Sequence, residues 1–125
     1  MTKHEFILTL LRSALWQQPL KHFDMTPWEY KAVMEEAEKQ CVQGLIIDCL
    51  QFNNMGLQKR CVIHMMQMRN ALIAENKKLN DNIIRLSELF EQQGIEYAIV
   101  KGQTLGVLYP KPELRIPGDI DFYVP

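Results

Sequence analysis

The sequence predicts an α+β fold that is mostly helical, because three patterns divide the chain into two parts. Apolar residues recur at intervals of three and four through most of the chain, which is the spacing of one face of a helix. Gly94 ends that pattern, and a continuous apolar run typical of a buried strand follows at residues 97–100. The last residues alternate between polar and apolar, as in a second strand. We therefore expect a helical region over residues 1–94 and a β-α-β segment over residues 95–125.

Capping signals and apolar stripes place three helices in the first half. The first is expected over residues 3–17, where an apolar face forms and Pro19 blocks continuation. Thr26 and Glu29 form a Thr-x-x-Glu capping box that begins a second helix. That helix is expected to run to about residue 42, and a short apolar helix follows at residues 45–52.

One long helix is expected over residues 57–93, because its apolar residues stay on one face and no proline interrupts them. At 1.5 Å per residue this helix would be about 55 Å long. Gly94 is a natural C-terminal cap. The stripe consists of Leu57, Cys61, Met65, Met68, Leu72, Leu79, Ile83, Leu86 and Phe90.

The remainder is expected to hold the only two strands of the chain, near residues 96–101 and 119–124. A short helix at residues 103–108 and a proline-rich connection lie between them. Side chains alternate between the faces of a strand. Asp119 and Asp121 should therefore share one face, while Ile120, Phe122 and Val124 point into a core.

Composition excludes several classes of protein. The formal net charge is −1, so no global basic field for nucleic acid exists. No apolar run reaches the roughly 18 residues that span a bilayer, and Arg12 interrupts the apolar start, so we expect neither a membrane segment nor a signal peptide. The cysteines lack zinc-site spacing and are interpreted as buried free thiols in a reducing cytoplasm: Cys41, Cys49 and Cys61.

The Asp119-x-Asp121 pair is the sharpest chemical feature. Two carboxylates held side by side repel each other unless a cation lies between them, and a hard divalent ion such as Mg²⁺ or Mn²⁺ takes oxygen ligands. Such ions stabilise the attacking and leaving oxygens of a phosphoryl transfer. An isolated Asp-x-Asp is more often a solvated strand end, so its context decides the interpretation.

That context is a strand-to-helix turn at Lys101 and Gly102. A glycine turn lets backbone N–H groups approach a phosphate, and a helix N-terminus favours its negative charge. The lysine adds a point charge for the same anion. Arg115, just before the acidic strand, is a further candidate phosphate ligand.

Together, Val100-Lys101-Gly102-x-x-Leu105, Tyr109-Pro110, Leu114-Arg115 and Gly118-Asp119-Ile120-Asp121 resemble an uncharacterised nucleotidyltransferase family of the DNA polymerase β-like superfamily. The resemblance covers residues 97–124 specifically and the preceding helices loosely. It implies that residues 95–125 begin a catalytic domain. It also implies a nucleoside triphosphate donor, Mg²⁺ held by Asp119 and Asp121, and transfer of a nucleoside monophosphate to an unknown acceptor hydroxyl.

In this family, the turn at Lys101, Gly102 and Gln103 would face the donor phosphates. Gln103 stands where the superfamily usually has Gly or Ser. The superfamily takes a third carboxylate from a later strand, and Glu113 is a poor substitute. We therefore expect the catalytic set to be incomplete and this chain alone to transfer little or no nucleotide.

Two other functions stay open on the sequence. The chain could be a non-catalytic helical interaction module with a vestigial Asp-x-Asp. A glycosyltransferase also uses Asp-x-Asp to hold a metal, but long helices rather than a nucleotide-binding α/β region precede the motif here.

The remaining features have simpler interpretations. Cys61 and His64 could share a helix face, but two ligands do not complete a zinc site. Trp16 and Trp28 are interpreted as packing anchors rather than stacking platforms. Self-association is expected through unpaired strand edges or through the long helix.

Overall fold

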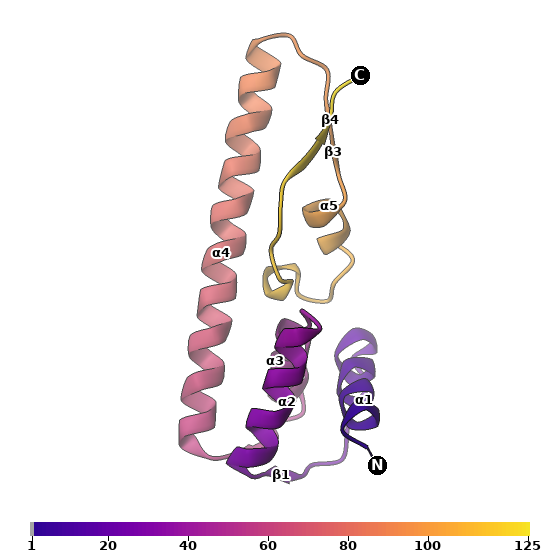
Figure 1. Ribbon diagram of the computed structural model, residues 1–125, viewed down its shortest axis with the longest axis vertical. Coiled ribbons are helices and arrows are strands. Elements are labelled where there is room, and N and C mark those ends of the chain that lie inside the picture. Colours follow the sequence, from indigo (N-terminus) through magenta and orange to yellow (C-terminus); the bar gives the residue numbers. More distant parts are fainter. Residues whose placement is uncertain (1) are drawn as a thin grey trace. The chain divides into compact units, whose positions relative to one another are not determined.

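The structure is a computed structural model that describes residues 2–125, and it is 64% helical with few short strands. The expected mostly helical α+β fold is therefore confirmed. The elements, most of which are labelled in Figure 1, are α1 (Lys3–Trp16), β1 (Asp24–Met25), α2 (Pro27–Lys39), α3 (Gln43–Phe52), β2 (Gly56–Leu57), α4 (Lys59–Gln92), β3 (Ala98–Val100), α5 (Gly102–Gly106), the 3₁₀ helix η1 (Pro112–Leu114) and β4 (Asp121–Tyr123).

The chain packs as two compact units, Met1–Ala71 and Leu72–Pro125, and α4 contributes residues to both. This division reflects which residues pack together and does not test the predicted boundary of the catalytic domain. The start of a catalytic domain at residue 95 stays a prediction.

Local capping explains where the first helices begin. The Thr26 hydroxyl accepts a hydrogen bond from the Glu29 N–H at 3.2 Å, and the Glu29 carboxylate accepts one from the Thr26 N–H at 3.2 Å. This confirms the capping box predicted for α2. Thr2 and Glu5 form the same arrangement at the start of α1.

Helices α1 and α3 form the core of the first unit. The apolar side chains on their packed faces are removed from water almost completely, and this burial is the main source of stability in a small domain. Asn53 links the two helices by donating to the Ser13 hydroxyl at 2.9 Å. The largest apolar side chains that are fully buried are Leu10, Ile46, Ile47 and Leu50.

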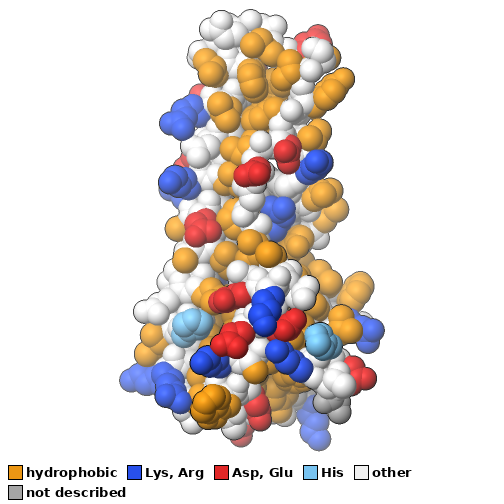
Figure 2. All heavy atoms as spheres, in the orientation of Figure 1, with side chains coloured by type: hydrophobic (Ala, Val, Ile, Leu, Met, Phe, Trp, Pro, Cys, Tyr) orange, Lys and Arg blue, Asp and Glu red, His pale blue; other side chains and the backbone are white. Residues whose placement is uncertain are grey.

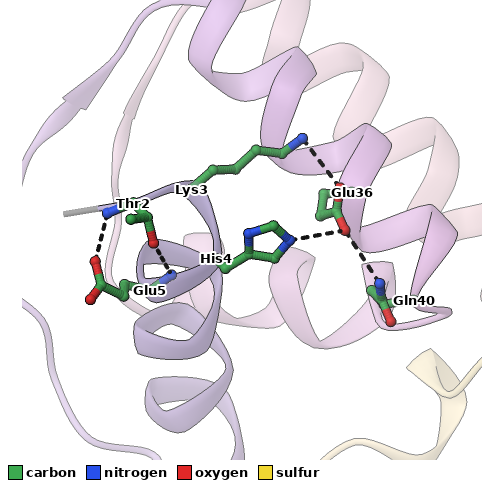
Figure 3. Close-up of polar contacts among 6 residues, drawn as sticks. All are labelled: Thr2, Lys3, His4, Glu5, Glu36 and Gln40. Atoms are coloured by element: carbon green, nitrogen blue, oxygen red, sulfur yellow. Dashed lines mark hydrogen bonds and ion pairs between the residues drawn. The ribbon is translucent and has the colours of Figure 1, made fainter.

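A buried carboxylate joins α1 to α2 (Figure 3). Glu36 lies 3.2 Å from the Lys3 ammonium and 3.8 Å from His4 Nε2, and it accepts a hydrogen bond from Gln40 at 3.3 Å. The Gln40 hydrogen bond and then the Lys3 hydrogen bond hold the pKa of Glu36 below its usual value. These contacts fix the N-terminal turn of α1 against α2.

The expectation of only two strands is wrong. The two-residue strands β1 and β2 pair in parallel, with Asp24 beside Gly56 and Met25 beside Leu57. A Cβ on Gly56 would collide with the Asp24 side chain, so any other residue here would force that side chain to move. In the sequence β1 lies between α1 and α2 and β2 lies between α3 and α4, so the pair joins two connections of the first unit.

In the second unit, the antiparallel strands β3 and β4 run beside the later turns of α4 (Figure 1). The rings of Phe90, Tyr97 and Phe122 form one cluster, with centroids 5.1 to 5.8 Å apart. Phe90 and Phe122 meet edge to face and Tyr97 is tilted against both, and such ring contacts add to the free energy gained from burial. The cluster therefore holds the hairpin against α4.

Gly94 ends α4 as predicted. It adopts a φ of 66°, in the left-handed region that favours glycine. Its N–H donates to the Glu91 carbonyl at 3.1 Å, and the Ile95 N–H donates to the Phe90 carbonyl at 2.9 Å. These two bonds are the Schellman arrangement, which satisfies the last carbonyls of the helix and turns the chain toward β3.

The two strands are shorter and more exposed than the sequence predicted. The register pairs Ile99 with Phe122 on the face toward the aromatic cluster, and Val100 with Asp121 on the opposite face. That opposite face is open, because Ala98, Val100 and Tyr123 are exposed. The continuous apolar run is therefore not a strand buried on both faces, and Val124, expected in a core, is exposed.

Several smaller expectations can be compared with the structure. Cys49 and Cys61 are buried free thiols, but Cys41 is exposed. Both tryptophans are exposed, Trp16 to 64% and Trp28 to 80%, so their interpretation as packing anchors is wrong.

No helix within residues 2–125 combines the length and apolar character needed to cross a membrane. Acidic and basic side chains are interspersed on the face drawn in Figure 2.

Candidate functional site

The connection from β3 to α5 has an unusual backbone. Lys101 adopts φ 56° and ψ −154°, a conformation that is rare outside glycine, and Gly102 follows with φ 39°. Such strained residues cost roughly 1–3 kcal/mol and are concentrated at functional sites. Within residues 2–125, the backbone N–H groups of Gly102 and Gln103 have no hydrogen-bond acceptor. The turn therefore offers two free donors beside a lysine.

The Asp-x-Asp segment lies next to this turn. Asp121 begins β4 directly opposite Val100, the residue before Lys101. A Cβ placed on Gly102 would lie 3.5 Å from the carbonyl oxygen of Asp119, so these backbones are in contact range. Asp119 precedes β4 rather than lying within it. The hairpin register thus brings together two segments that the sequence separates by the whole α5–η1 connection.

Both aspartates are free of ion pairs. Among residues 2–125, no lysine, arginine or histidine lies within salt-bridge distance of Asp119 or Asp121. Asp121 is half-buried and Asp119 is exposed. Their charges are therefore available to an external cation.

Arg115 is held in a defined position by neutral groups. Its Nη1 donates to the Gln103 side-chain oxygen at 3.2 Å. Its side chain crosses the buried Gly106, where a Cβ would lie only 3.1 Å from Arg115 Cδ. Arg115 forms no ion pair with any described residue. An unpaired, oriented guanidinium is a suitable ligand for a phosphate or carboxylate.

Asn76 on α4 organises this region and is not among the site residues predicted from the sequence. Asn76 is only 2% exposed. Its amide donates to the backbone carbonyls of Glu113 at 2.8 Å and Arg115 at 2.7 Å, with a longer bond to Leu72 at 3.1 Å. The signal was present, because position 76 is a polar interruption of the apolar stripe between Leu72 and Leu79.

Gln103 connects Asn76 to Arg115. Its side-chain nitrogen donates to Asn80 at 2.7 Å and to Asn76 at 3.4 Å, while its oxygen accepts from Arg115. The side chain is thus fully occupied by partners on α4 and at residue 115. Any contact of Gln103 with a ligand would therefore come from its backbone N–H.

These groups make an arrangement suited to an anion accompanied by a hard cation. The free N–H groups and the unpaired guanidinium would bind anionic oxygens. The two free carboxylates would contribute to binding a divalent ion. No cluster of three or more His, Cys, Asp or Glu that could hold a metal occurs within residues 2–125, so neither the aspartates nor Cys61 and His64 form a complete protein cage.

Comparison with known protein families relates the chain to one of them. A family model described as an uncharacterised nucleotidyltransferase matches residues 26–125, which is most of the chain. No curated protein and no solved structure matches. The matched segment contains the turn, the arginine and both aspartates.

Proposed function

Because the chain belongs to this uncharacterised nucleotidyltransferase family, we propose that its site binds a nucleoside triphosphate together with Mg²⁺ or Mn²⁺. The reaction would transfer the nucleoside monophosphate to an acceptor hydroxyl. Asp119 and Asp121 would hold the cation, while Lys101, Gly102, Gln103 and Arg115 would bind the donor phosphates.

The observation that carries the proposal is the register of the hairpin. Val100 opposite Asp121 sets the acidic pair beside the Lys101–Gly102 turn, and the Asp119 carbonyl approaches Gly102. A nucleoside triphosphate and its cation need anion ligands and carboxylates in the same small volume. The pairing of β3 with β4 provides that proximity.

The donor set suits Mg²⁺. This ion keeps several waters and is usually held by one or two carboxylates together with substrate phosphates. Two aspartates without other charge partners meet that requirement and do not need a third protein ligand for initial binding. When bound, the cation would offset the negative charge that develops on the transferred phosphoryl group.

The residues of the chain would orient the donor. The N–H groups of Gly102 and Gln103 and the Arg115 guanidinium would fix the phosphate oxygens, since Asn76 and Gln103 already hold Arg115 in place. Such preorganisation avoids reorientation during the reaction. The reducing cytoplasm, where nucleoside triphosphates are abundant, is the compartment we expect for this activity.

The test is binding of Mn²⁺ and ATP by the full chain, observed as paramagnetic broadening of backbone amide signals. Broadening should be strongest at residues 119–121 and should extend to Gly102 and Gln103 when ATP is added. The Asp119→Asn/Asp121→Asn variant should lose it, while Asp81→Asn, which removes an exposed carboxylate on α4, should keep it. The same spectrum for all three proteins would contradict the assignment and favour the alternative of a non-catalytic helical module.

A further inference from the structure

A second candidate site lies in the first unit, where Trp28 is left in water. Trp28 is 80% exposed in the first turn of α2, although a tryptophan ring gains more from burial than most side chains. It borders a hollow of about 340 Å³ that is also lined by residues of the first turns of α4. Small-molecule sites begin at roughly 300 Å³, so the hollow is large enough for one ring and its substituent.

The floor of the hollow is formed by packed side chains. Tyr30 and Cys61 are buried there. The Tyr30 hydroxyl lies 2.9 Å from His64 Nδ1, and the two rings meet edge to face at a centroid distance of 5.8 Å. This pair fixes the orientation of the histidine ring at the wall of the hollow.

The tautomer of His64 decides whether the contact with Tyr30 leaves a hydrogen-bond donor on the other ring nitrogen. Burial, followed by the neighbouring Cys61 and Glu38 charges, raises the pKa of Tyr30 to about 12, so its hydroxyl keeps its proton. When this hydroxyl donates to Nδ1, the neutral imidazole carries its own proton on Nε2. His64 then offers an N–H to a ligand.

The rim of the hollow is positive. Arg60 and Lys31 line it, and no carboxylate does. Lys31 lies 3.9 Å from Glu35, whereas Arg60 forms no ion pair with any described residue. An unpaired arginine beside an exposed tryptophan complements a ligand that is both planar and anionic.

We propose that this hollow binds a small molecule composed of an aromatic ring and an anionic group, with the ring stacked on Trp28 and the anion paired with Arg60. Lys31 adds charge at the rim, and His64 donates a hydrogen bond. The proposal is independent of the triphosphate site, because all of these residues lie in the first unit.

Fluorescence of Trp28 provides a direct test in the full-length chain. The chain has two tryptophans, so Trp16→Phe leaves Trp28 as the only indole reporter. We expect saturable quenching by AMP and by benzoate, which both combine a ring with an anion. Adenosine lacks the anion and ribose 5-phosphate lacks the ring, so each should bind about tenfold more weakly than AMP, the effect of losing about 1.4 kcal/mol.

Single substitutions test which residues bind the ligand. Arg60→Gln should weaken AMP binding about tenfold, and Trp28→Ala should abolish the shift of the His64 imidazole signal that AMP causes in nuclear magnetic resonance spectra. Lys21→Gln removes an exposed cation elsewhere in the first unit, and Arg115→Gln alters the triphosphate site, so both should leave quenching unchanged. Circular dichroism confirms that each variant keeps its helices.

Three results would overturn the proposal. The first is no saturable quenching by either AMP or benzoate. The second is equal weakening by Arg60→Gln and Lys21→Gln, which would show only a general charge effect. The third is a change in Trp28 emission with protein concentration alone, which would show that a second copy of the chain covers the ring.

Discussion

Different interactions stabilise the interior of each of the two compact units. In the first unit, the largest fully buried side chains come from α1 and α3 and are mainly apolar. In the second unit, the apolar core is small, and the buried Asn76 donates hydrogen bonds to the backbone carbonyls of Glu113 and Arg115. Apolar burial stabilises without direction, whereas hydrogen bonds contribute a modest net free energy but fix positions. The candidate triphosphate site lies on the unit whose geometry depends on directed bonds.

The largest expected effect is therefore in the first unit. Ile46 is fully buried, so Ile46→Ala should lower the free energy of unfolding by about 2–5 kcal/mol through lost burial and a cavity. Denaturant unfolding followed by circular dichroism measures this change. Leu8→Ala, at an exposed position of α1, is the matched control and should change stability by less than about 0.5 kcal/mol. Equal losses in the free energy of unfolding for Ile46→Ala and Leu8→Ala would show that α3 does not lie at the centre of the hydrophobic core.

The open face of the hairpin should promote self-association. Tyr123 is 60% exposed on that face, and covering such a side chain contributes roughly 1.5–3 kcal/mol. Both strands also have unpaired edges, which readily recruit another strand. We expect light scattering at micromolar concentration to detect species above the chain mass of 14.7 kDa, and Tyr123→Lys to reduce them. Association that survives Tyr123→Lys would place the contact on the long helix instead.

Loss of the Asn76 amide should disturb the second unit selectively. Asn76→Leu leaves the carbonyls of Glu113 and Arg115 without their donor, at a cost of about 1–3 kcal/mol. Hydrogen exchange should accelerate over residues 103–115 and stay unchanged in α1 and α3. Asn80→Ala removes only the exposed bond to Gln103 and should have a smaller effect. Uniform acceleration through both units would contradict a separate role for Asn76.

The smallest effect concerns acid stability of the first unit. The pKa of Glu36 is lowered in the folded chain, so its ionised form stabilises the fold above the usual value of 4.5. That contribution is lost as the pH falls below about 4.5 and through the folded-state pKa. Thermal unfolding of Glu36→Gln should therefore depend less on pH in this range than that of the parent chain. Glu88→Gln, on the exposed side of α4, should retain the parent's acid dependence.

Features set by neighbouring residues could be predicted from the sequence. The capping box at Thr26 and Glu29 and the end of α4 at Gly94 each depend on contacts within a few residues. The short helix after the Lys101–Gly102 turn was expected for the same reason. Helix ends are determined by residues close to them in the sequence, so they can be predicted from the sequence alone.

Features that join distant segments could not be predicted in the same way. The pairing of Asp24 with Gly56 involves strands of two residues, too short to show alternation. The exposure of Trp28 depends on which residues surround it in space, whereas its residue type alone predicts a position in the core. For the candidate site, the residue types could be identified from the sequence, but the hairpin register and the partners of Arg115 depend on how distant segments pack together.

The backbone of Lys101 has a consequence for directed evolution of this chain. At φ 56° and ψ −154°, glycine would fit with less strain than any other residue. A selection for thermal stability alone should therefore enrich Lys101→Gly, and a selection for triphosphate binding should retain lysine. A residue that two selections drive in opposite directions marks a position where stability is given up for function.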